Sequence, residues 1–169
     1  MPRMDGMQLC KKLKNDEKTS HIPIIILTAK ADSKSKIEGL DTGADDYIPK
    51  PFDIEELSAR IRNLIENRKR LQEKFARQML LKPKQVQLES MDDKFVNRIS
   101  EIIDAHISDT SFGVEIFARE AGMSVAQLYR KINALTGFTP NDLIRDMRLQ
   151  HAASVLKKKS GNIADAAYQ

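Results

Sequence analysis

The sequence predicts a chain of two differently built parts, an α/β part followed by an all-α part. Residues 22–29 (IPIIILTA) form an apolar run rich in β-branched side chains, typical of a strand buried on both faces of a parallel sheet. From Asp92 onward, apolar residues recur at helical spacing instead. Residues 60–90 carry nine basic and three acidic side chains, which indicates a basic helical connector. We therefore divide the chain into residues 1–66, 67–90 and 91–169.

The composition excludes several classes of protein. With 169 residues, a net charge of +4 and 41% hydrophobic residues, the chain suits a soluble globular protein. No apolar run is long enough to span a membrane, and the start does not resemble a signal peptide. Cys10 is the single cysteine and the three histidines are dispersed, which argues against a disulfide framework or a metal cluster. We expect a cytoplasmic, reducing setting.

In the first part, helices and strands are expected to alternate. Leu9, Cys10 and Leu13 fall at helical spacing before the first strand, and residues 32–44 read as a second helix with Gly43 as its C-terminal cap. Residues 46–48 (DYI) then form a second short strand. This order is a slice of a doubly wound α/β domain.

The two predicted strands end in residues that suit phosphate chemistry. Thr28 closes the first strand, and Lys50 follows the second between Pro49 and Pro51. Chemistry in such sheets gathers at the carboxyl ends of the strands. A hydroxyl and an ammonium there can hold a phosphoryl group. The alternative is that Thr28 is a plain strand cap and Lys50 a surface residue.

The stretches MPRMDGMQLCKKLK, IPIIILTAKAD and GLDTGADDYIPKPFDIEEL resemble the second half of a response-regulator receiver domain, over residues 1–66. The resemblance implies an incomplete flavodoxin-like fold with the last two parallel strands. It also implies that Thr28 and Lys50 contact a phosphoryl group, that the bond before Pro51 is cis, and that Tyr47 is the aromatic residue that reports phosphorylation.

The same resemblance places the acceptor aspartate about three residues before Met1, and the acidic pair for Mg²⁺ earlier still. We therefore expect no phosphoacceptor and no cofactor in this chain, with Mg²⁺ only in the intact receiver. Asp5 is read as part of a turn, and Asp45 and Asp46 as surface residues. Because two strands rarely form a stable sheet alone, we expect this part to be poorly packed, or paired with a missing fragment or a second copy, and the start to be a truncation point.

The connector is expected to begin as a helix at Ile54, after an acidic capping box formed by Asp53 and Glu56. Apolar residues then recur at Ile54, Leu57, Ile61, Leu64, Leu71 and Phe75. This apolar stripe fits either one helix that packs on its own domain or a two-chain coiled coil. Beyond Asn67 we favour the coiled coil, and hence a homodimer through residues 54–80.

In the last part, Ala118, Gly122, Ser124 and Leu128 have the spacing of a helix-turn-helix. The small residue allows close helix approach, the glycine permits a left-handed turn, and the serine caps the next helix. The second helix of such a motif can enter a major groove. A tight helical hairpin without a DNA role is the alternative.

The second helix carries the candidate DNA-contacting residues. The side expected to face inward carries Val125, Leu128 and Ile132. The side expected to face DNA carries Ser124, Ala126, Tyr129, Arg130, Lys131 and Asn133. Arg130 can read guanine, and Lys131 suits phosphate. Further contacts to the DNA backbone are expected from Arg119, Arg145 and Arg148.

The stretch SVAQLYRKINALTGFTPNDLIRDMRLQHAASVL resembles the DNA-binding module of AraC-type transcription regulators, over residues 92–169. The resemblance places the base-reading positions on Ala126, Tyr129 and Arg130, with double-stranded DNA as partner. Residues 162–169 match the opening of that family's second helix-turn-helix, whose recognition helix we expect to be missing.

Together the two resemblances imply the output end of a hybrid two-component regulator, which transfers phosphoryl groups from a histidine kinase module and controls transcription. The output is expected in the cytoplasm, with the intact parent anchored in the membrane through a sensor region. The main alternative is a dimerisation or interaction fragment that does not read DNA alone. A phosphatase of the haloacid type needs a nucleophilic aspartate on its first strand, so we expect no enzyme.

Overall fold

The computed structural model describes residues 4–29, 42–81 and 90–157. Its chain forms two compact units, Met1–Leu71 and Gln72–Gln169, and each is described by itself. Three expectations lie wholly or largely outside the described residues: the helix at 32–44, the connector at 82–89, and the opening of a second helix-turn-helix at 162–169. No described helix is both long enough and apolar enough to cross a membrane.

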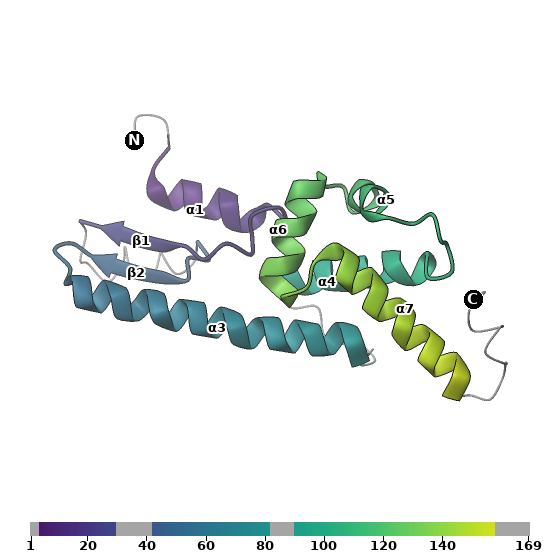
Figure 1. Cartoon of the computed structure of the whole chain (residues 1–169). Helices are drawn as coiled ribbons and strands as arrows, with labels where there is room; N and C mark the ends of the chain where they lie inside the picture. Colours follow the sequence, from purple (N-terminus) through teal and green to yellow (C-terminus); the bar gives the residue numbers. More distant parts are fainter. Residues whose placement is uncertain (1–3, 30–41, 82–89, 158–169) are drawn as a thin grey trace. The chain divides into compact units, whose positions relative to one another are not determined.

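The first unit contains the predicted alternation of helix and strand. Helix α1 (Gly6–Asn15) begins at Asp5, whose side chain accepts the backbone N–H of Gln8 in a capping box, and it buries Cys10. Strands β1 (Ile25–Thr28) and β2 (Asp46–Pro49) are parallel neighbours, drawn side by side in Figure 1. The predicted strands are thus confirmed, and Asp5, which we read as part of a turn, also caps α1.

Asp45 is exposed, as expected, whereas Asp46 is half-buried and the expectation that it is a surface residue is wrong. The side chain of each is 23% exposed and takes part in hydrogen bonds. Asp45 accepts from Lys14 Nζ of α1 at 2.5 Å and from the backbone N–H of Ile24 at 2.7 Å. Asp46 accepts two hydrogen bonds of 3.0 Å from Arg60. The two carboxylates therefore connect the start of β2 with three other segments. These are α1, the residue before β1, and the helix that follows β2.

Helix α3 (Ile54–Leu81) begins at the predicted residue. In the first unit its Arg60 bonds Asp46 and also Glu56, and these hydrogen bonds, that to Glu56 foremost, raise the pKa of its guanidinium. The same part of the helix leaves Ile54, Ile61 and Ile65 exposed. Its apolar residues therefore do not all pack on the strands of this unit.

The final part of α3 belongs to the second unit, and this corrects the coiled-coil expectation. Phe75 is 3% exposed and lies in the core of that unit. It is therefore not available to a second chain. The helical module itself supplies a core for this part of α3.

The described residues of the second unit contain four further helices: α4 (Met91–Ala105), α5 (Val114–Glu120), α6 (Val125–Thr136) and α7 (Pro140–Lys157). The predicted stripe on α4 is confirmed, since Phe95, Ile99 and Ile103 are fully buried. They pack in one core with Phe117, Leu128, Ile132, Leu135, Leu143 and Met147. Because α6 contributes to this core along its length, its opposite face is held outward.

Candidate nucleic-acid interface

A tight turn joins α5 to α6. Ala118 is 2% exposed, and its carbonyl accepts the backbone N–H of Met123 at 2.9 Å. Gly122 has φ of 68°, a left-handed conformation that costs a side-chain-bearing residue energy. The turn thus has the geometry that the spacing of Ala118, Gly122 and Ser124 predicted.

Both ends of α6 are capped. Ser124 accepts the N–H of Gln127, whose side chain accepts the N–H of Ser124 in return. At the other end Gly137 has φ of 77°, and its N–H donates to the carbonyl of Asn133 at 2.9 Å. Ser124, which we expected to face DNA, therefore has its hydroxyl occupied in starting the helix.

The outward face of α6 carries Ala126, Arg130 and Asn133, all exposed, and Tyr129, which is half-buried. The hydroxyl of Tyr129 accepts from Asn141 Nδ2 at 3.2 Å. Among the residues that the structure describes, none forms a hydrogen bond or ion pair with the Arg130 side chain. A guanidinium that faces solvent in this way can donate two hydrogen bonds to the edge of a guanine base.

Lys131 is not on this face, and its expected contact with phosphate is corrected. Its side chain is fully buried, and Nζ lies 3.2 Å from Asp92 Oδ1 and 4.6 Å from the centre of the Phe95 ring. The expected inward position of Val125 is also wrong, since that residue is 38% exposed. The buried face of α6 is therefore shifted from Val125 towards Lys131.

The three additional arginines have different surroundings. Arg119 is exposed, and Arg145 is exposed and paired with Asp142 at 3.0 Å. Arg148 donates to the carbonyl of Asp109 at 2.6 Å. Arg148 thus ties α7 to the loop after α4, whereas Arg119 and Arg145 present their charge to solvent.

In the first unit three of the predicted phosphoryl-sensing residues, Thr28, Lys50 and Pro51, lie at one end of the strand pair, and Tyr47 lies near the start of β2. Thr28 pairs in register with Pro49, and the carbonyl of Thr28 accepts the backbone N–H of Lys50. The Lys50–Pro51 bond is cis, as the resemblance implied. Lys50 is exposed and Tyr47 is buried. The strand ends are thus brought together, while the sensing role of all four residues stays a prediction.

The described residues contain no group of three or more His, Cys, Asp or Glu side chains that could hold a metal ion. The Mg²⁺ of a receiver stays an expectation for the intact domain.

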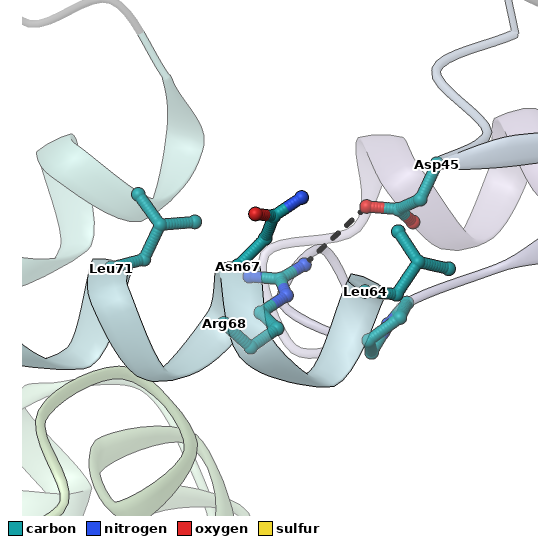
Figure 2. A pocket seen from close by; sticks show the side chains of 6 residues that line it. Asp45, Leu64, Asn67, Arg68 and Leu71 are labelled. Carbon is teal, nitrogen blue, oxygen red and sulfur yellow. Dashed lines mark ion pairs between the residues drawn. The ribbon is translucent and has the colours of Figure 1, made fainter. Parts of the chain in front are cut away.

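A separate hollow of about 260 Å³ lies in the first unit. It is lined by Pro23, Asp45, Leu64, Asn67, Arg68 and Leu71. Figure 2 shows Arg68 of α3 directed towards Asp45, with 3.8 Å between their nearest charged atoms. Since Asp45 also bonds Lys14, this hollow is bordered by an ion-pair network that supports the fold.

Comparison with protein families identifies both parts. Residues 1–62 match the model of the response regulator receiver domain, and residues 117–169 match that of a helix-turn-helix domain. The helix-turn-helix is of the AraC type. Both domains are typical of regulators rather than enzymes. The chain therefore joins a part that matches a receiver domain to a part that matches a helix-turn-helix domain.

Three relatives illustrate the breadth of the match. The protein of Formosa agariphila named histidine kinase P4 is 41% identical to the chain over all 169 residues. The match covers the whole chain and 12% of that protein. It is 46% identical over 71 residues to the DNA-binding dual master transcriptional regulator RpaA of Synechocystis, covering 42% of the chain and 30% of that protein. The response regulator ArlR of Staphylococcus aureus is 54% identical over 65 residues, which cover 38% of the chain and 28% of that protein. The chain thus spans less than a third of each relative.

Proposed function

We propose that this chain is the output end of a hybrid two-component regulator, in which α6 reads a specific DNA sequence. The observation that carries the proposal is Arg130, exposed on a helix that is capped at both ends and backed by a buried core. The helix-turn-helix match over residues 117–169 supports the same reading. In this role the chain regulates transcription and has no catalytic activity of its own.

Ala126, Tyr129, Arg130 and Asn133 are the proposed DNA-facing residues. Arg130 supplies a bidentate donor for guanine, and Ala126 offers a methyl contact to a thymine methyl group. Tyr129 holds its hydroxyl towards Asn141, so its ring edge is the part directed to DNA. Ser124 starts the helix so that these side chains point outward, and Arg119 and Arg145 supply charge for the phosphate backbone.

Control of DNA binding by phosphorylation is the second part of the proposal. Thr28 and Lys50 lie at adjacent strand ends. Tyr47 of β2 and Pro51, which follows Lys50, stand at positions that match the receiver family. In the intact protein a histidine kinase module supplies the phosphoryl group to a receiver aspartate, with Mg²⁺ bound nearby. Similarity of the whole chain to 12% of a protein named as a histidine kinase supports this partnership.

A homodimer acting in the cytoplasm completes the proposal, with a membrane-anchored sensor in the parent. The exposed Ile54, Ile61 and Ile65 on α3 supply apolar area for a partner chain, while Phe75 does not. The alternative of an interaction fragment without DNA reading is not favoured, because the helix-turn-helix match covers α6 and α7.

Selection from a random pool of duplex DNA tests this function. The proposal predicts enrichment of a short motif by the 169-residue chain, bound more tightly than a scrambled duplex at the same salt concentration. Recovery of unenriched sequence, with binding that only fades as salt rises, would contradict it.

A further inference from the structure

The carbonyls that end α6 receive a side-chain donor from outside the helix-turn-helix. Gln72 of α3 donates from Nε2 to the carbonyl oxygens of Asn133 and Ala134, both at 3.0 Å. The last carbonyls of a helix lack intrahelical partners. Gln72 is 61 residues away from Asn133 in sequence and acts as a second cap beside Gly137.

Phe75 makes this cap part of the packed unit. It lies one helical turn after Gln72 on α3, so both side chains face the same way. Phe75 is buried in the core that also contains Ile132 and Leu135 of α6. The side chains flanking them on α3, Glu73 and Lys74, are exposed. One stripe of α3 therefore contacts α6 by burial at Phe75 and by hydrogen bonds at Gln72.

We propose that Gln72 is a positioning residue for DNA reading, which holds the C-terminal turn of α6 and thereby fixes the side chains on its outward face. This inference rests on the proposed function, since it assumes that α6 contacts DNA. Asn133 lies in the capped turn and Arg130 one turn earlier. A frayed last turn would loosen both, because each helical residue is held through its neighbours' hydrogen bonds.

The contacts of Gln72 and Phe75 place the start of the DNA-binding unit earlier in the chain than the sequence resemblances do. The resemblance to the AraC type begins near residue 92, and the helix-turn-helix match begins at residue 117. Gln72 and Phe75 precede both limits. Because α3 is one continuous helix that begins at Ile54, the helix that ends the receiver part also supplies the cap of the recognition helix.

Three variants of the full chain separate the cap from general packing. Gln72→Glu keeps the shape of the side chain but replaces its donor with a carboxylate, which repels the carbonyls and the negative end of the helix dipole. Gln72→Lys restores a donor, and a cation is favourable at a helix C-terminus. Glu73→Gln is the matched control, because it exchanges the same two groups at the exposed neighbouring position.

Amide hydrogen exchange of free protein is the first measurement, because it does not depend on DNA. Loss of one net hydrogen bond predicts exchange about three- to tenfold faster at residues 133–137 in Gln72→Glu. Gln72→Lys is expected to return the rate to that of the parent, and Glu73→Gln to leave it unchanged. Unchanged exchange in Gln72→Glu would overturn the cap.

The second measurement uses the duplex enriched by the parent chain and a scrambled duplex. The ratio of the two affinities is compared, since a changed net charge affects both duplexes alike. Gln72→Glu is expected to lower this ratio about three- to tenfold. Gln72→Lys is expected to keep the ratio at that of the parent chain. Faster exchange with an unchanged ratio would overturn the positioning role. A parent chain that enriches no motif would overturn the proposed function and this role together, while the exchange result still decides the cap.

Discussion

Lys131 of α6 and Asp92 of α4 form an ion pair in the core of the second unit, with 3.2 Å between Nζ and Oδ1. The lysine side chain is fully buried and the aspartate side chain 15% exposed. The ammonium also lies over the Phe95 ring, an arrangement that attracts a cation to the ring face. This pair joins the recognition helix to the helix behind it.

The pair predicts an asymmetric response to mutation. Asp92→Asn removes the negative charge beside a fully buried ammonium, and is expected to lower the free energy of unfolding by about 3–5 kcal/mol. Lys131→Met keeps an apolar chain against Phe95 and leaves Asp92 with its access to solvent, so we expect a smaller loss. Denaturant titration measures both.

The double variant Asp92→Asn with Lys131→Met checks this explanation, since replacing both charges of a buried pair is often neutral. It is expected to be more stable than Asp92→Asn alone. Lys94→Met, at an exposed position on α4, is the control. Additive losses in the double variant would argue against coupling between the two charges.

Burial of Lys131 also predicts its behaviour towards DNA. Removing a lysine that contacts phosphate reduces the slope of affinity against salt by about one counterion. Lys131→Met is expected to leave this slope unchanged, whereas Arg145→Gln, which removes an exposed charge, should reduce it. A reduced slope in Lys131→Met would show that the side chain reaches DNA after all.

Ser124 predicts a stability effect through its cap. Ser124→Ala removes the acceptor for the N–H of Gln127 and is expected to cost about 1 kcal/mol of unfolding free energy. Ser124→Gly should cost only a few tenths of a kcal/mol. Ser108→Ala, at an exposed loop position, is the control. Equal losses for alanine and glycine, measured by thermal unfolding, would contradict the capping role.

Asp45 gives a local prediction for the first unit. Its carboxylate accepts the backbone N–H of Ile24 and the ammonium of Lys14. Asp45→Ala removes both acceptors, so the Ile24 amide is expected to exchange about tenfold faster or more. Glu55→Ala, an exposed residue on α3, should leave it unchanged. Protection that survives in Asp45→Ala would show that other contacts hold this strand start.

Local patterns allowed much of the fold to be predicted from sequence. The β-branched run gave β1, the spacing on α4 gave its buried stripe, and glycine at position 122 indicated the turn before α6. The cis bond before Pro51 followed from family resemblance. Each of these depends on neighbouring residues, where chain geometry alone restricts the outcome.

The errors have a common cause, which is partners distant in sequence. Lys131 stands three residues after Leu128 and four before Leu135, so helical spacing already placed it inward. Its charge suggested the surface because lysine is rarely buried without a partner, and Asp92 is 39 residues away. The same applies to Asp46 with Arg60, and to Gln72 and Phe75, whose partners on α6 are not apparent from the pattern of α3.

The most direct test of the account compares the parent chain with Arg130→Ala on the enriched duplex. Arg130 is exposed, and among the described residues its side chain has no hydrogen bond or ion pair, so the free energy of unfolding is expected to be unchanged. The account predicts that the substitution lowers affinity for the enriched duplex by about 1–3 kcal/mol and relaxes discrimination at one base pair. Unchanged affinity and discrimination in a folded Arg130→Ala chain would contradict the claim that α6 reads DNA through this residue.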